Sequence, residues 1–343
     1  MYRSLRHIWQ VAAFLLIALL LVARPDAADA QQPAFDLPIA CEMGIVCVVQ
    51  NYVDDDPGPG AADYTCGLLA YDGHDGTDIR VPNMTYVANG VPVLAAAAGR
   101  VVGVRDGVRD VNVAEIGVAT VQGFECGNRV ALDHGGGWIT DYCHMRMGSV
   151  QVKMGQVVAT GDVLGLVGMS GLAEFPHVHF SVRLRNASLD PFVGLVPPTG
   201  CGAPRTPLWS AKAQASLRYA TSGLLNAGFA DAPPERSEVL AGRHQSPTLA
   251  RNAANLVFWV EIYGLQAGDR ARLRVTAPNG RSIANSEEQP ASRPQPSRLV
   301  YTGLRRTTPQ WEAGVYKGVY VLERMINGAW TTVFTVERQV ELR

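Results

Sequence analysis

The amino-acid sequence predicts a mainly β protein with two folded domains. The 343 residues include 35 glycines and 21 prolines, which favour turns and short strands over long helices. Between residues 71 and 200, short apolar runs of strand length are separated by turn residues about every 8 to 12 positions, which predicts a β-rich region. A hydrophobic content of 47% and a charged content of 18% provide for two cores at about 150 residues per domain.

The charges are nearly balanced. Lysine and arginine number 30 and aspartate and glutamate 31, so the formal net charge is -1. A protein that neutralises phosphates needs a basic surface, and this composition offers no excess of cations. We therefore expect no nucleic-acid partner.

The N-terminus has the pattern of a secretory signal. Arg3 and Arg6 precede an apolar run, Val11 to Ala23, and Ala28-Asp29-Ala30 supplies the small-x-small cleavage pattern. The run is shorter than the roughly 20 residues of a membrane span. We expect an exported protein, periplasmic or secreted, with no stable membrane span after the signal is cleaved. An uncleaved anchor is the alternative.

Export makes disulfides the expected state of the six cysteines, and the absence of Cys-x-x-Cys spacing argues against a zinc knuckle. Locality favours Cys41–Cys47. Cys126 and Cys143 flank a glycine turn at 135–137 almost symmetrically and would face each other across a hairpin. The other two pair by elimination. The six candidates are Cys41, Cys47, Cys66, Cys126, Cys143 and Cys201.

The regions beyond the β-rich segment carry weaker signals. An Ala-rich stretch, Ser210 to Leu225, favours one helix in a proline-broken connector. Turn signals at 278–280 and 327–328 separate five or six strands typical of a small β-sandwich, which would be a binding or spacer module. The expected parts are a signal peptide (1–30), an irregular N-terminal extension (31–70), a β domain (71–202), a connector with a possible helix (203–250) and a C-terminal β-sandwich (251–343).

An acidic run, Asp54-Asp55-Asp56, lies in the N-terminal extension. It lacks the spaced ligands and the glycine of a calcium loop. We expect a solvated turn.

Five of the seven histidines lie between positions 74 and 179, and two motifs there have the spacing of a metal site. In an extended chain, His74 and Asp78 would present an imidazole and a carboxylate on one face. In 176–182, Val178, Phe180 and Val182 alternate with polar residues, so His177 and His179 would share the face opposite the core. We expect His144 on the strand after the glycine turn, and a structural role for His134.

Two histidines and one aspartate can hold a zinc ion and leave a coordination position open, as catalytic zinc requires. Water bound there loses a proton near neutral pH, and further histidines can transfer protons. These residues therefore predict a metal hydrolase.

The order of the motifs resembles the LytM/lysostaphin-type zinc metallopeptidases, peptidase family M23. The resemblance covers about residues 71 to 193. Its parts are His74-Asp75-Gly76-Thr77-Asp78, Gly127-Asn128, His134-Gly135-Gly136, Tyr142-Cys143-His144, a glycine-rich hairpin from Gly155 to Gly165, Gly168-Met169-Ser170-Gly171, and Pro176-His177-Val178-His179-Phe180.

The resemblance implies an antiparallel β-sheet peptidase domain over 71–202, with a lipoyl-like hairpin region. It implies one Zn²⁺ per chain held by His74, Asp78 and His179, with His144 and His177 as the catalytic pair that does not bind the metal. It also implies peptidoglycan peptides as substrate, and with that substrate the C-terminal β-sandwich could contact the cell wall or a protein partner. Inserts at about 83–89 and 106–126 depart from the family pattern and would reshape the substrate groove.

Given this resemblance, we expect zinc-bound water to attack a peptide carbonyl, with His177 as base and His144 stabilising the oxyanion or orienting the water. The two roles could be exchanged. Several alternatives are weaker. A facial-triad iron oxygenase does not explain export or the extra histidine pair. A serine hydrolase lacks the Gly-x-Ser-x-Gly elbow, and a lipoyl or biotinyl carrier lacks a lysine at a symmetric turn. The strongest alternative is a catalytically silent, wall-binding activator of other peptidoglycan hydrolases.

Overall fold

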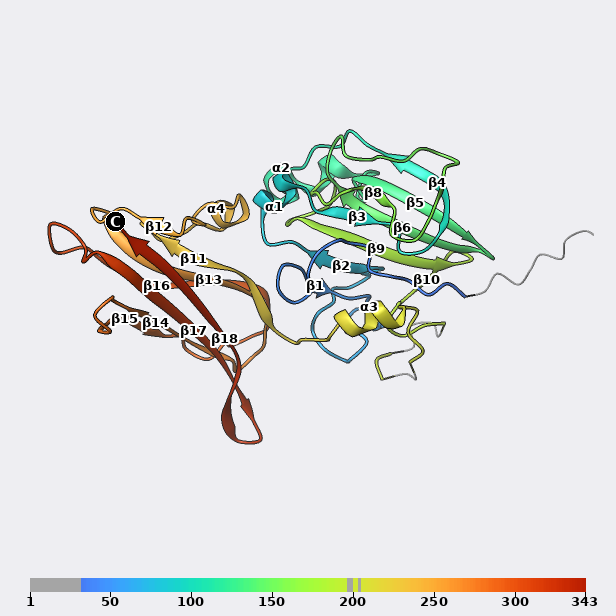
Figure 1. The fold of residues 1–343 in the computed structure, drawn as a ribbon. Coiled ribbons are helices and arrows are strands. Elements are labelled where there is room, and N and C mark those ends of the chain that lie inside the picture. Colours follow the sequence, from blue (N-terminus) through green and yellow to red (C-terminus); the bar gives the residue numbers. More distant parts are fainter. Residues whose placement is uncertain (1–31, 196–199, 203–204) are drawn as a thin grey trace, which may run out of the picture. The chain divides into compact units, whose positions relative to one another are not determined.

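The computed structural model describes residues 32–195, 200–202 and 205–343 (Figure 1). The expected signal peptide and its cleavage pattern lie outside these residues. Within the described ranges, no helix has both the length and the apolar character to cross a membrane. The protein is mainly β, and its sheets are largely antiparallel, as expected from the sequence.

The first domain is built on one large antiparallel sheet. Its strand order is β1-β2-β9-β6-β5-β4-β7, and β10 pairs with β9. This order places β2 beside β9, so the two histidine motifs lie on neighbouring strands. The strands are β1 (Val48–Asn51), β2 (Thr77–Arg80), β4 (Gly99–Arg105), β5 (Asn128–Gly135), β6 (Trp138–Met145), β7 (Val157–Val158), β9 (His177–Leu184) and β10 (Ala187–Leu189).

A two-stranded sheet and three short helical segments complete this domain. β3 (Pro92–Leu94) pairs with β8 (Val163–Leu166). The two inserts expected from the sequence each form helix: α1 (Met84–Asn89) lies in the first, and α2 (Val113–Ile116) with the 3₁₀ helix η1 (Val118–Val121) in the second. The side chain of Asn83 caps α1 by accepting a hydrogen bond from the backbone N–H of Thr85, and so stabilises its first turn.

The alternation expected in β9 is present. Val178, Phe180 and Val182 are fully buried in the core of the first domain, where Phe180 packs against Phe35 and Trp209. The opposite face of β9 carries the histidines, and it is also largely covered. One face of this sheet is therefore hydrophobic core and the other is the floor of a polar site.

The segment expected to be an irregular extension contributes a strand. β1 pairs antiparallel with β2, with Asn51 opposite Asp78. The expectation of a solvated acidic turn is wrong for Asp54 and Asp55, which are both buried. Burial of Asp54 is possible because its carboxylate accepts hydrogen bonds from the backbone N–H groups of Asp56, Ala62 and Gly73 in place of water.

Three disulfides join the six cysteines in the arrangement favoured by the sequence. The bonds are Cys41–Cys47, Cys66–Cys201 and Cys126–Cys143. The last of these lies beside the polar face of the large sheet.

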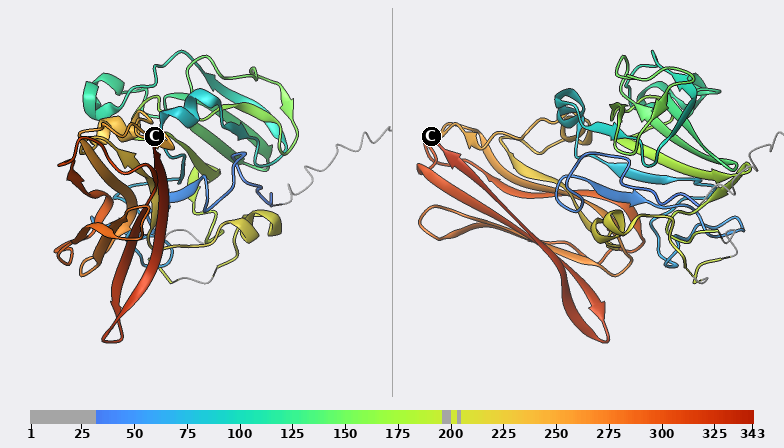
Figure 2. Two further views of the ribbon diagram at one scale, coloured as in Figure 1. Left: turned by 60° about the vertical axis from the view of Figure 1, so that its left-hand side comes forward. Right: turned by 45° about the vertical axis from the view of Figure 1, so that its right-hand side comes forward.

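The C-terminal strands form two sheets around one core (Figure 2). The sheet orders are β11-β13-β16 and β12-β18-β17-β14-β15. β11 lies in the segment expected to be a connector, and the expected helix is shorter than the Ala-rich stretch. The elements are α3 (Ala211–Ser216), β11 (Gly223–Ala230), α4 (Arg236–Leu240), β12 (Thr248–Leu249), β13 (Asn255–Leu265), β14 (Arg270–Thr276), β15 (Ser282–Glu287), β16 (Gln295–Arg305), β17 (Gly314–Ile326) and β18 (Ala329–Leu342).

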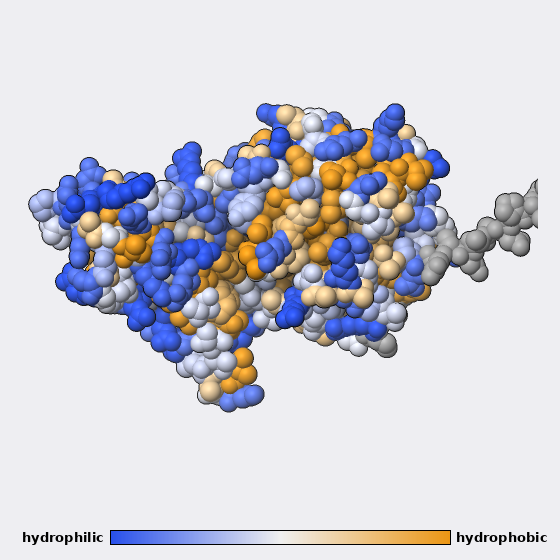
Figure 3. Space-filling model, viewed as in Figure 1, coloured by the Kyte–Doolittle hydropathy of each residue, from blue (hydrophilic) through white to orange (hydrophobic). Residues whose placement is uncertain are grey.

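The exposed hydrophobic residues of the described chain include two groups on different sheets (Figure 3). In the first domain they lie on β4, β7 and β8, and include Val102, Val157 and Val163. The second group is at the tip of the β17–β18 hairpin, where Ile326 and Trp330 are exposed.

Candidate metal centre and its cleft

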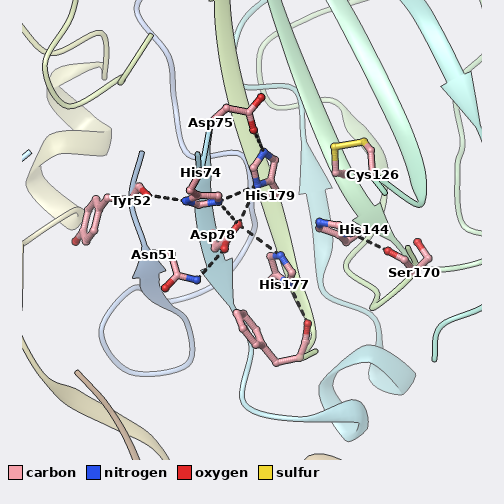
Figure 4. A network of polar contacts seen from close by, with 12 residues as sticks. Asn51, Tyr52, His74, Asp75, Asp78, Cys126, His144, Ser170, His177 and His179 are labelled. Carbon is pink, nitrogen blue, oxygen red and sulfur yellow. Dashed lines mark hydrogen bonds and ion pairs between the residues drawn. A yellow bond between two sulfur atoms is a disulfide. The ribbon is translucent and has the colours of Figure 1, made fainter. Parts of the chain in front are cut away.

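Two imidazoles and one carboxylate converge at the polar face of the large sheet (Figure 4). His74 Nε2 lies 3.2 Å from Asp78 Oδ1 and 3.2 Å from His179 Nδ1, and His179 Nδ1 lies 3.0 Å from Asp78 Oδ1. Asp78 and His179 are directly opposite each other on β2 and β9. The structure thus brings together the three residues expected to be ligands.

His74 does not lie on the extended strand that its spacing to Asp78 suggested. It sits in the turn before β2, where its backbone N–H donates to the carbonyl of Tyr71. Its Nδ1–H donates to the carbonyl of Tyr52 at 2.6 Å, and the backbone N–H of Asp54 donates to the carbonyl of His74 at 2.8 Å. These bonds fix the ring so that the Nε2 lone pair faces the other two ligand atoms.

The middle position of the motif from His74 to Asp78 has no room for a side chain, and Gly76 occupies it. A Cβ atom at this position would overlap the imidazole of His179 and would lie 2.9 Å from the carbonyl oxygen of Phe180. The residue must therefore be glycine for β9 to bring His179 against the loop between His74 and Asp78.

Asp75 and Asn51 orient the other two donors. His179 Nε2 lies 3.3 Å from Asp75 Oδ1, which leaves Nδ1 directed at the centre. The amide of Asn51 donates to Asp78 Oδ2 at 2.9 Å, which leaves Oδ1 directed at the same point. Each of the three donor atoms is thus selected by a hydrogen bond to the opposite side of its own side chain, an arrangement typical of metal ligands.

The charges of the site favour an ionised carboxylate. Burial by itself would raise the pKa of Asp78, but the neighbouring imidazoles His74 and His177 outweigh it and hold that pKa well below the usual range. Burial by itself would lower the pKa of His179, but hydrogen bonds and charges from Asp75 and Asp78 raise it to about 9. Without a cation, His179 therefore carries a proton at neutral pH.

The donor set fits zinc. In a tetrahedral site with bonds of about 2.0–2.1 Å, neighbouring ligand atoms lie about 3.3 Å apart. The three separations here, from 3.0 to 3.2 Å, are close to that value. Two nitrogens and one oxygen are ligands that zinc accepts, and three protein ligands leave a fourth position for solvent or substrate.

His144 lies beside this centre because of a local change in β6. Strand alternation would place it on the core side with Tyr142, but its φ of 58° and a register shift between β5 and β6 turn it to the polar side. Its Nδ1–H donates to the carbonyl of Ser170 at 2.7 Å, which leaves Nε2 free. Ser170 is held in turn by its hydroxyl, which accepts from the N–H of Asn128 and donates to the carbonyl of Met145.

His177 and His144 form a neighbouring pair of rings whose centroids are 4.6 Å apart. His177 Nδ1–H donates to the carbonyl of Phe175, and its Nε2 lies 3.4 Å from Asp78 Oδ1. Burial and the charges of His177 and His179 hold the pKa of His144 well below its usual value, so its ring is neutral. The ring of His144 therefore presents an unprotonated Nε2 beside the centre.

His134, expected to be structural, is bonded away from the site. Its ring nitrogens contact the carbonyl of Ala98 and the hydroxyl of Thr140.

The candidate metal centre opens into a cleft of about 320 Å³. Besides His74, His144 and His179, the cleft is lined by the Cys126–Cys143 disulfide and by Tyr71, Gly73, Asp75, Glu125, Arg129, Asp141, Leu172, Ser181 and Arg183.

Comparison with known proteins gives the same family as the motifs. Residues 72–191 match the sequence model of peptidase family M23. This segment is an M23 domain. The resemblance inferred from the sequence is confirmed, and the motifs named there contain the four histidines around the centre, His74, His144, His177 and His179.

The M23 domain is similar to parts of larger proteins. It is 36% identical over 110 residues to the cell division protein DipM of Caulobacter vibrioides, covering 32% of this chain and 14% of DipM. It is 30% identical over 117 residues to the peptidoglycan DD-endopeptidase ShyB of Vibrio cholerae, covering 34% of this chain and 22% of ShyB. The catalytic domain of lysostaphin from Staphylococcus simulans is 25% identical with a TM-score of 0.26, covering 39% of this chain and 86% of that domain.

Four residues that support the M23 centre were not expected from the sequence. Asn51, Tyr52 and Asp54 come from the N-terminal segment, and Asp75 lies within the first motif but was given no role. No local pattern marks the first three, since their function depends on a long-range pairing of β1 with β2. Asp75 could have been suspected, because metal-bound histidines commonly donate to a carboxylate.

Proposed function

We propose that this protein is an exported zinc metalloendopeptidase that hydrolyses peptide bonds in peptidoglycan cross-links. The observation that carries the proposal is the convergence of His74, Asp78 and His179 at zinc-like separations, with the His144–His177 pair beside them. The match to the M23 family supports peptidase activity, and similarity to the peptidoglycan DD-endopeptidase ShyB supports peptidoglycan as the substrate class.

His74, Asp78 and His179 would hold one zinc ion per chain. Zinc in such a site polarises a carbonyl and lowers the pKa of a bound water to about 7, which supplies a nucleophile at neutral pH. The contribution of Asn51, Tyr52 and Asp75 is to keep each donor lone pair directed inward, so that little reorganisation is needed when the cation binds.

The two remaining histidines, His144 and His177, would act on the attacking water and its proton. We assign His177 as the base, since its free Nε2 lies nearest the ligand Asp78. A neutral Nε2 has no hydrogen to donate to an oxyanion, so we assign His144 to orient the attacking water through a hydrogen bond that its Nε2 accepts. Because both rings donate Nδ1–H to backbone carbonyls, both are held in the tautomer that accepts a proton at Nε2, and the two roles can be exchanged.

The test is digestion of purified cell-wall sacculi by the zinc-loaded full chain, followed by mass analysis of the released fragments. We expect fragments from cleaved cross-link peptides and none when a chelator is present. His144→Ala should keep its zinc and lose about 10²–10⁴ in turnover, as for the loss of a general acid or base.

The same experiment distinguishes the proposed endopeptidase from a catalytically silent activator of other hydrolases. A silent activator would bind sacculi and release no fragments while fully loaded with zinc. That outcome would overturn the proposed activity, and an increase in the rate of a second, added peptidoglycan hydrolase would then identify the activator.

A further inference from the structure

A second group of charged side chains lies on the same sheet face as the candidate ligands. Arg129, Asp141 and Arg183 come from β5, β6 and β9, which are neighbours in the sheet. On β9 the polar face presents His179, then Ser181, then Arg183, because alternate residues share a face. This Arg129–Asp141–Arg183 group therefore continues the cleft floor away from the centre.

One buried carboxylate holds both guanidinium groups. Asp141 Oδ1 accepts a hydrogen bond from Arg129 Nη2, and Asp141 Oδ2 accepts one from Arg183 Nη2. The Asp141 side chain is only 5% exposed, whereas each arginine side chain is 33% exposed. A guanidinium carries five N–H donors, so both arginines keep donors for a further partner after bonding to Asp141.

The group carries a surplus positive charge. Two arginines and one aspartate sum to +1, and the charge faces a cleft rather than open solvent. The other carboxylates of the cleft have partners of their own: Asp75 pairs with His179, and Glu125 accepts a hydrogen bond from the backbone N–H of Gly123. Among the described residues, neither of these carboxylates forms an ion pair with Arg129 or Arg183, so both guanidinium groups can bind a ligand.

We propose that Arg129 and Arg183, fixed in place by Asp141, form a subsite that binds a free carboxylate of the substrate peptide. The planar fork of a guanidinium matches a carboxylate, and Asp141 has already ordered both side chains before binding. This proposal rests on the proposed function, and names a feature of its substrate: an acidic peptide.

The position of the subsite sets where that carboxylate lies. His179 and Arg183 are four residues apart on β9, which is about 13 Å at roughly 3.3 Å per residue. An extended peptide advances by about the same distance in four residues. The carboxylate should therefore lie within about four residues of the cleaved bond.

The experiment measures binding, so that it does not depend on hydrolysis. The probe is a labelled synthetic stem peptide of peptidoglycan with free carboxylates, and its twin has every carboxylate converted to a methylamide. We expect the zinc-loaded full chain to bind the acidic peptide about tenfold more tightly than the amide. In Arg183→Gln and in Arg129→Gln this preference should fall to less than threefold, with affinity for the amide unchanged.

Matched variants separate a specific subsite from general effects. Arg274→Gln changes an exposed arginine on β14 and should keep the full preference. Arg183→Lys keeps the charge without the fork and should bind with intermediate affinity. Zinc content and thermal unfolding of each variant show that the fold and the centre are intact.

Two results would overturn the subsite. One is equal binding of the acid and the amide by the unaltered protein. The other is an equal loss of affinity for both peptides in Arg183→Gln. If the acidic peptide binds with the expected preference but sacculi are not cleaved, the subsite stands and the proposed hydrolysis fails.

Discussion

Asp75 and Asp78 contact the imidazole of His179 from opposite sides. Asp75 Oδ1 lies 3.3 Å from Nε2, and Asp78 Oδ1 lies 3.0 Å from Nδ1. The first contact orients the ring and the second brings it to the other donor atoms. His179 is thus placed by two carboxylates of the same loop-and-strand segment, four residues or fewer from His74.

Asp75→Asn should weaken zinc binding without abolishing it. The variant loses the negative charge of Asp75, which fixes the His179 ring and makes that ring a stronger metal ligand. Changes of this kind typically cost about 10- to 100-fold in metal affinity. Competition with a zinc chelator measures the change. Asp72→Asn, an exposed aspartate in the same turn, is the matched control and should bind zinc normally. Equal affinities of the two variants would contradict the role of Asp75.

Zinc affinity should rise with pH. Because His179 has a pKa of about 9 without a cation, zinc must displace a proton from it at any lower pH. Asp78, whose pKa is held low, adds no further proton. From about pH 6 to pH 8 the apparent affinity should therefore increase roughly tenfold per pH unit, and the slope should flatten in Asp75→Asn. A pH-independent affinity would show that His179 is not protonated in the free protein.

Gly76→Ala should disrupt the centre although it removes no donor. The added methyl group would occupy the space of the His179 ring and press on the carbonyl of Phe180. We expect at least a tenfold loss of zinc affinity, measured by the same competition, as for displaced ligands. Gly58→Ala, where the new methyl meets only the Asp56 side chain, is the control. Normal zinc binding by Gly76→Ala would mean that the loop and β9 are not in close contact.

Removing the disulfide beside the cleft should affect turnover more than metal binding. The carbonyl of Cys126 accepts the N–H of His144, and Cys143 precedes His144 on β6. Replacing both cysteines with serine should lower the free energy of unfolding by about 3 kcal/mol for a bond that spans 17 residues. Turnover should fall while zinc content stays near that of the unaltered protein.

The Cys66–Cys201 bond offers the comparison. It spans 135 residues and lies away from the cleft lining, so its replacement by serines should cost more stability and less turnover. If both double variants lose turnover in proportion to their stability, the bond at the cleft has no special effect on His144.

The sequence was sufficient to predict features that depend on local pattern. Strict alternation in β9 separates Val178 and Phe180 from His177 and His179, and the side chains lie on opposite faces as expected. No local rule pairs strands that lie about 100 residues apart. The prediction that β2 and β9 meet at one site therefore depended on the family motifs. The same dependence on long-range pairing explains why β1 and its Asn51 were not foreseen.

Other features depend on backbone geometry that alternation does not predict. His144 faces the cleft only because its left-handed φ and the register shift in β6 interrupt the pleat. The Arg129–Asp141–Arg183 group has no motif, since its members come from three strands and meet only in the folded sheet. For Asp54 and Asp55 the sequence predicted exposure, because a run of acidic residues is usually solvated. In the fold, backbone N–H groups donate hydrogen bonds to the Asp54 carboxylate and allow it to be buried.

The most direct test of the metal centre is the zinc content of the purified protein. We predict about one zinc per chain, lost in His179→Ala and retained in His244→Ala, which removes an imidazole from the loop after α4. Elemental analysis of the three proteins, each shown to be folded by thermal unfolding, gives the answer. Full zinc content in His179→Ala would contradict the assignment of His74, Asp78 and His179 as the ligands.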